Sequence, residues 1–126
     1  MLTKSLLISD FNLSNFAALL KNQSGLDPVL APYGQVIQVL LQKDLECWQD
    51  NYDCIIVWTR PEAISMEFAR QLRNETTDLS MIMQDVDNYA KQVLNLTDRT
   101  KTVLVPSWVV PTYQRSFGIL SMQQNV

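Results

Sequence analysis

The chain contains no histidine among its 126 residues. Histidine is the usual general base of enzymes, the commonest metal ligand and the middle member of a Ser–His–Asp triad. A serine hydroxyl in this sequence therefore lacks the side chain that normally removes its proton. We predict a chain that binds no metal and no cofactor, and that is not catalytic by itself.

Clusters of lysine and arginine are also absent, and the formal net charge is −3. Nucleic acids and anionic membrane surfaces are bound through basic faces, so neither is an expected partner. No apolar run approaches membrane-spanning length, and only three apolar residues follow Lys4, too few for a signal peptide. These absences favour a cytoplasmic protein.

Cysteine is scarce, since Cys47 and Cys54 are the only two. Their spacing matches no metal motif, and we interpret them as a reduced, buried pair. Apolar residues make up 47% of the chain and charged residues 18%, a composition typical of a globular protein rather than a disordered one. At this length, we expect one domain that comprises residues 1–126.

The chain does contain short apolar runs that alternate with helical segments. Strands are predicted around 6–8, 26–31, 52–58 and 102–106, and helices at about 13–22, 36–41, 61–72 and 79–96. This alternation predicts an α/β fold, a three-layer parallel sheet with helices on both faces. The strands at 6–8, 55–58 and 103–105 are the most continuously apolar, so we expect them to be central and adjacent. Pro28 lacks a ladder donor and should place its strand at the edge.

The clearest helix is predicted at 79–96. Eight apolar residues keep to one side of it, and we interpret this stripe as core: Leu79, Ile82, Met83, Val86, Tyr89, Ala90, Val93 and Leu94. We expect Val86 and Val93 to be buried against the sheet, with Gln84, Asp87 and Lys91 in water. Residues 114–126 show no clear pattern, and no helix follows the last strand, so we expect a chain truncated at its C-terminus, the N-terminal part of a longer protein.

Candidate functional residues follow the predicted strands. In an open parallel sheet, ligands bind outside the carboxyl ends of the strands. The catalytic candidates are Ser9 and Asp10, which directly follow the first strand. The substrate-binding candidates are polar or aromatic residues after the strands: Asn12, Tyr33, Gly34, Thr59, Arg60 and Trp108.

Each of these residues has both a functional and a structural interpretation. Ser9 is a displaced nucleophile or a turn residue that ends a strand. Asp10 is a turn residue too, or a phosphoryl acceptor like that of receiver domains. Receiver domains gather several carboxylates at neighbouring strand ends, whereas Asp53 precedes its own strand and so lies at the opposite pole of the sheet. Arg60 can hold a phosphate or carboxylate, or is a solvated charge at a helix start. Tyr33 and Trp108 can line a pocket or pack at its rim.

Four segments together resemble a known family. They are 6–11, 31–35, 52–58 and 102–106, of which the loop Pro32-Tyr33-Gly34-Gln35 is the most specific. Their order and spacing resemble the N-terminal SGNH-hydrolase-like domain of FkbH-like proteins, from Leu6 to about Pro111. In that family, a phosphatase-type domain of the haloacid-dehalogenase class follows.

The resemblance implies an SGNH-hydrolase or flavodoxin-like fold. It also implies a role in loading a glyceryl or related acyl unit onto an acyl carrier protein, in biosynthesis of polyketides and other secondary metabolites. The possible partners are thus an acyl carrier protein or the downstream phosphatase-type domain.

The catalytic motifs of SGNH hydrolases are not retained. The nucleophile block falls on residues 9–11, so Phe11 or Asp10 occupies the serine position. Gly34 matches the glycine of the second block, and its N–H is the one expected oxyanion donor. The third block, near Trp58-Thr59-Arg60, lacks its glycine and asparagine, and the closing Asp-x-x-His is missing.

We therefore expect a non-catalytic or degenerate SGNH-like domain that positions a substrate or carrier protein. One alternative is an SGNH-type ester hydrolase whose Asp-x-x-His lies beyond residue 126. Another is a flavodoxin- or receiver-like binding module.

Overall fold

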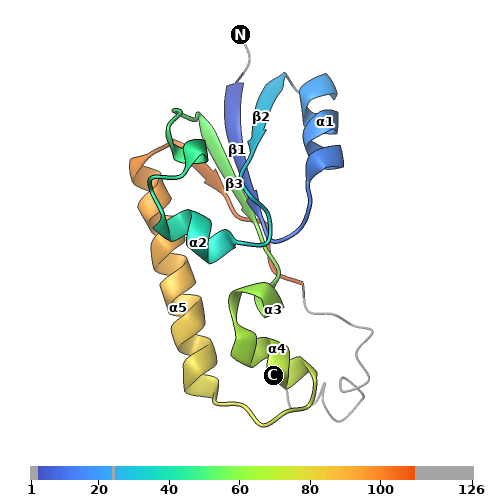
Figure 1. Ribbon diagram of the computed structural model, residues 1–126, viewed down its shortest axis with the longest axis vertical. Helices are drawn as coiled ribbons and strands as arrows, with labels where there is room; N and C mark the ends of the chain where they lie inside the picture. The colour runs from blue at the N-terminus through green and yellow to red at the C-terminus, as the bar shows by residue number, and fades with distance from the viewer. Residues whose placement is uncertain (1–2, 24, 110–126) are drawn as a thin grey trace.

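The computed structural model describes residues 3–23 and 25–109. It confirms the predicted α/β character of the chain (Figure 1). The elements, in chain order, are β1 (Thr3–Ser9), α1 (Ser14–Gln23), β2 (Leu26–Leu30), α2 (Val36–Leu41), the 3-10 turn η1 (Glu46–Trp48), β3 (Cys54–Trp58), α3 (Pro61–Ile64), α4 (Met66–Leu72), α5 (Leu79–Asn95), the 3-10 turn η2 (Leu96–Asp98) and β4 (Thr102–Leu104). The final residues, including those predicted to lack a pattern, lie outside the described part.

The described strands form a four-stranded sheet, all parallel, in the order β2-β1-β3-β4. β1 is central, with Leu6 aligned to Val29 of β2 on one side and to Ile55 of β3 on the other. β2 carries Pro28 and lies at the edge, as predicted, because proline cannot donate to a second neighbouring strand.

The strand around residues 103–105 lies next to β3 as predicted, but it is not central among the described strands. β4 has a strand neighbour on only one side within the described residues, and it is three residues long. Leu104 and Val105 are each nearly half exposed. The apolar run was interpreted as burial on both faces, but among the described residues this strand forms an edge of the sheet.

The core lies on both faces of the sheet. α1 covers one face, where Leu7 of β1 and Ile56 of β3 pack with Leu13 and Ala17. α2 and α5 lie over the other face (Figure 1), where the buried residues include Leu6, Ile8, Val39, Leu40, Ile55, Val57, Tyr89 and Leu96. Successive residues of a strand point to opposite faces, so the unbroken apolar runs of β1 and β3 supply both clusters. The arrangement is compatible with a three-layer fold.

The interpretation of the whole α5 stripe as core was wrong. Ile82 and Tyr89 face the core, whereas Leu79, Met83 and Leu94 are 68%, 55% and 66% exposed. Val86 and Val93, predicted to be buried, are only partly buried. A helix on a sheet buries one limited stripe, and the apolar arc of α5 is wider than the surface beneath it.

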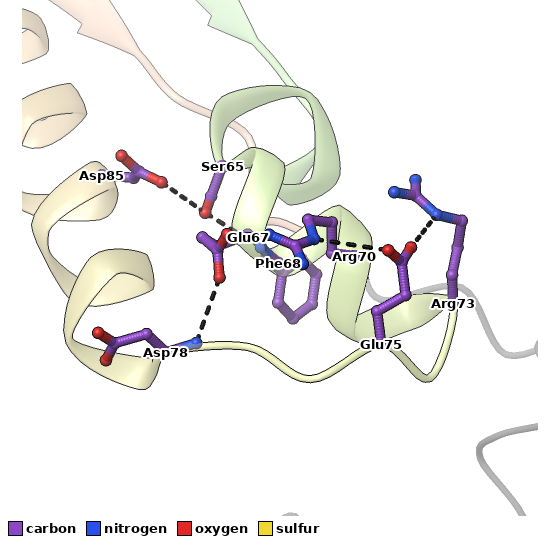
Figure 2. Close-up of polar contacts among 8 residues, drawn as sticks. All are labelled: Ser65, Glu67, Phe68, Arg70, Arg73, Glu75, Asp78 and Asp85. Carbon is purple, nitrogen blue, oxygen red and sulfur yellow. Dashed lines mark hydrogen bonds and ion pairs between the residues drawn. The ribbon is translucent and has the colours of Figure 1, made fainter.

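α5 is attached to α4 by polar contacts that Figure 2 shows. The hydroxyl of the buried Ser65 accepts from the Phe68 N–H at 3.2 Å, which caps α4, and donates to Asp85 of α5 at 2.8 Å. The Glu67 carboxylate accepts from the N–H of Asp78, the residue that caps α5. Ser65 thus ends α3, starts α4 and holds α5, where one continuous helix was predicted from 61 to 72.

Neighbouring substitutions on α5 test which side faces the core. We expect Ile82→Ala to lower the free energy of unfolding by about 2–4 kcal/mol, because it removes buried methyl groups and leaves a cavity. Met83→Ala should change it by less than about 1 kcal/mol, because that side chain lies mostly in water. Urea denaturation of both variants measures the difference, and equal losses would contradict the orientation of α5.

Candidate functional site

The candidate site lies at the carboxyl ends of β1 and β3. From β1 the chain crosses to β2 on one side, and from β2 it returns past β1 to β3 on the other. The direction of winding therefore changes between β1 and β3, and ligands of open parallel sheets bind at such a switch point. Ser9 and Trp58, the last residues of these strands, are aligned, so the loops that follow them begin side by side.

An ion pair between Asp10 and Arg60 spans the switch point. One oxygen of Asp10, Oδ2, accepts hydrogen bonds from Arg60 Nε at 3.1 Å and from the Arg60 backbone N–H at 3.2 Å. The Asp10 side chain is 5% exposed and that of Arg60 57% exposed. The other oxygen of Asp10, Oδ1, is buried without a hydrogen-bond partner among the described residues. The structure thus brings together two residues that the sequence separates by 50 positions.

Ser9 is held inside the turn. It is 3% exposed, and its hydroxyl accepts from the Phe11 N–H at 3.1 Å. The Ser9 carbonyl accepts from the Gly34 N–H at 3.1 Å, and Gly34 has a φ of +81°, which favours glycine. The N–H expected as an oxyanion donor is therefore used within the protein, to join the loops after β1 and β2.

Asn12 and Tyr33 line a small cavity beside Phe11. Its volume is about 120 Å³, below the roughly 300–1,000 Å³ usual for ligand pockets. The side-chain oxygen of Asn12 accepts from the Ser14 N–H at 2.9 Å, so Asn12 supports the start of α1. Tyr33 is largely exposed. The cavity has room for only a small chemical group.

Thr59 and Trp108 meet in a third group, with Tyr89 of α5. The buried Thr59 hydroxyl accepts from Trp108 Nε1 at 2.8 Å and lies 3.0 Å from the Tyr89 hydroxyl. The rings of Tyr89 and Trp108 stack with their centroids 5.5 Å apart. Burial raises the pKa of Tyr89, the hydrogen bond to Thr59 opposes this rise, and the nearby charge of Asp10 adds to it. Tyr89 is therefore protonated at neutral pH.

The hydrogen bonds among Thr59, Tyr89 and Trp108 leave one hydroxyl proton without an acceptor among the described residues. Whichever hydroxyl donates in the Thr59–Tyr89 bond, the other keeps a proton without an acceptor among the described residues. Asp10 Oδ1 is a buried acceptor without a donor.

Tyr89 is the site residue that the sequence did not indicate. It fell within the apolar stripe of α5 and was assigned to the core with the rest. A tyrosine in such a stripe usually finds a hydrogen-bond partner when buried, which was the one available signal. Its partner, Thr59, lies 30 residues away on another element.

Other chemistry-bearing side chains lie away from this edge. Asp53 accepts from the Lys4 N–H at 3.0 Å, at the opposite pole of the sheet. Cys47 and Cys54 are free and partly buried, and burial raises the pKa of both thiols. Within residues 3–23 and 25–109, no group of three or more His, Cys, Asp or Glu side chains could hold a metal, and no helix is long and apolar enough to cross a membrane.

Comparison with protein-family models, with curated proteins and with solved structures found no match to the chain. Its function is therefore inferred from the geometry of the switch point together with the sequence motifs.

Asp10 is buried and Arg60 is largely exposed, so substitutions of the two residues should lower the free energy of unfolding by different amounts. Arg60→Gln should lower the free energy of unfolding by about 1–3 kcal/mol, because the buried Asp10 carboxylate loses its charged donor. Asp10→Asn should cost less than about 1 kcal/mol, because the exposed arginine head regains water. Chemical denaturation measures both.

Arg73→Gln is the matched control, since Arg73 forms an exposed ion pair with Glu75. We expect no measurable change in stability from this variant. A larger loss from Asp10→Asn than from Arg60→Gln would contradict the account of the pair.

Proposed function

We propose that this chain is a non-catalytic or degenerate SGNH-hydrolase-like domain, the N-terminal part of an FkbH-like enzyme. Its role is to position a substrate or an acyl carrier protein in glyceryl or acyl transfer during secondary-metabolite biosynthesis. Within this proposal the protein is cytoplasmic, and its partners are a carrier protein or a downstream phosphatase-type domain.

The strand order supports the fold assignment. The order β2-β1-β3-β4 is that of the first four strands of a flavodoxin-like sheet, whose ligand binds at the switch point between the first and third strands. The segments that carry the family resemblance include the loops at this same edge after β1 and β2.

The closed position after β1 is the observation that carries the non-catalytic assignment. An SGNH hydrolase presents its nucleophile there, and a nucleophilic serine needs a base within hydrogen-bond reach. Here the Ser9 hydroxyl is buried against the Phe11 N–H, and Asp10 is engaged by Arg60. The chain also has no histidine that could serve as the base. The polar groups of this turn are therefore used in structural hydrogen bonds.

The same edge retains groups that can bind a ligand. The two terminal nitrogens of Arg60 have no hydrogen bond to the described residues, and they can hold an anionic group of a substrate or carrier.

An ester assay tests the absence of catalysis. We expect the purified chain to show no repeated turnover of short-chain esters, because no base serves Ser9 and losing triad members leaves only a small residual rate. Ser9→Ala and Asp10→Asn are assayed beside it. Multiple turnovers that vanish in either variant would support the hydrolase alternative and overturn the non-catalytic assignment.

A titration with an acyl carrier protein tests the binding role. Holo carrier protein, which bears the phosphopantetheine arm, should shift the amide resonances of residues around Asn12, Tyr33 and Arg60, and apo carrier protein should shift them less. Arg60→Gln should weaken binding roughly tenfold, the scale of one charge-assisted bond, while Arg73→Gln should not. Identical spectra with and without holo carrier would contradict a carrier-binding role.

A further inference from the structure

The small cavity where β1 and β2 end and α1 begins has an apolar inner end and a polar outer end. Leu7, Leu13 and Ala31 line it and are buried, with exposed fractions of 1%, 5% and 6%. Asn12 and Tyr33 also line it, and both are exposed. This polarity suits a ligand that has an apolar end and a polar end.

The volume of the cavity limits the apolar end of such a ligand to a short chain. An apolar protein cavity of about 150 Å³ binds benzene, which has six carbon atoms. A cavity of about 120 Å³ therefore holds roughly four carbon atoms. None of the described residues in its lining is charged, so an ionised group has no counter-charge inside it.

The outer end of the cavity offers hydrogen-bond donors. The Asn12 side-chain oxygen already accepts from the N–H and the hydroxyl of Ser14, so its amide hydrogens remain without an acceptor among the described residues. The exposed Tyr33 hydroxyl likewise has no partner in the described part of the chain. Ser9 also lines the cavity, and its oxygen accepts from the Phe11 N–H. Free donors at the mouth of an apolar cavity are complementary to a carbonyl oxygen that carries a short alkyl chain.

We propose that this cavity binds the short acyl group of a thioester, with up to about four carbons. The alkyl chain lies among Leu7, Leu13 and Ala31. The carbonyl oxygen accepts from the Asn12 amide. This inference rests on the proposed function and narrows it, from a glyceryl or related acyl unit to an acyl unit without hydroxyl groups. The hydroxyl groups of a glyceryl unit would enter an apolar space, and burying them without partners is unfavourable.

The test is an NMR titration of the full chain with thioesters of N-acetylcysteamine, which mimic the end of a loaded carrier arm. We expect the affinity to rise about fourfold for each methylene from acetyl to butyryl, the gain from burying one such group. It should fall at hexanoyl, because the closed inner end pushes the carbonyl away from Asn12. The glyceroyl thioester should bind about tenfold more weakly than the propionyl thioester of the same carbon number.

Two variants test the two ends of the cavity. Leu13→Ala removes three carbons from the inner end, so the tightest ligand should become hexanoyl or longer. Asn12→Asp keeps the side-chain oxygen that accepts from the Ser14 N–H but removes the amide hydrogens. It should weaken every thioester roughly tenfold and leave butyryl the tightest. Asn15→Asp is the matched control, since Asn15 is exposed on α1 and does not line the cavity, and it should change no affinity. Thermal unfolding confirms that each variant is folded.

An affinity that keeps rising from butyryl to octanoyl overturns the proposal, as does a glyceroyl thioester that binds as tightly as propionyl. A folded Leu13→Ala chain that still prefers butyryl does so too, and so does an Asn12→Asp chain that behaves like Asn15→Asp. The carrier-protein titration fails or succeeds separately. Binding of butyryl thioester without binding of holo carrier protein retains the acyl site and contradicts the carrier role. Binding of holo carrier protein without binding of any thioester does the reverse.

Discussion

The parallel pairing of β1 with β3 is the constraint on which the rest of the structure depends. Leu6, Ile8, Ile55 and Val57 are completely buried, and the two strands run side by side for five residue pairs. Apolar side chains on both faces hold this pairing in one register, because a slip by one residue would exchange the two faces. The same register brings the residue after β1 to the residues after β3, and so creates the pair of Asp10 and Arg60.

The polar groups at this edge are mutually dependent. Asp10 is buried, so its carboxylate requires Arg60, and the Arg60 backbone contributes a second bond to the same oxygen. Thr59, the neighbouring residue, joins β3 to α5 and to Trp108 through its hydroxyl. A buried network is stable only when its members find partners. Among the described residues of this edge, Asp10 Oδ1 is a buried acceptor without a hydrogen-bond partner.

Two surfaces of the described residues differ in chemistry. The switch point exposes the head of Arg60 beside a closed turn. The side of α5 away from the core exposes aliphatic side chains, and the groove beside it has no charged side chain in its lining. Tyr89 and Trp108 line this groove and also contact Thr59, so the two surfaces adjoin one another.

The sequence by itself determined the α/β alternation, the central position of β1 and β3 and the edge position of β2, because these follow from local periodicity and from the chemistry of single side chains. It also indicated most site residues, since strand ends can be read from apolar runs. Only the tertiary structure decided which of them meet: Asp10 with Arg60, Ser9 with Gly34, and Thr59 with Tyr89 and Trp108. It also decided that β4 lies at an edge of the described sheet and that half of the α5 stripe faces water. An apolar pattern indicates which side chains avoid water but not which surface covers them. For a helix, that surface depends on how many strands lie beneath it.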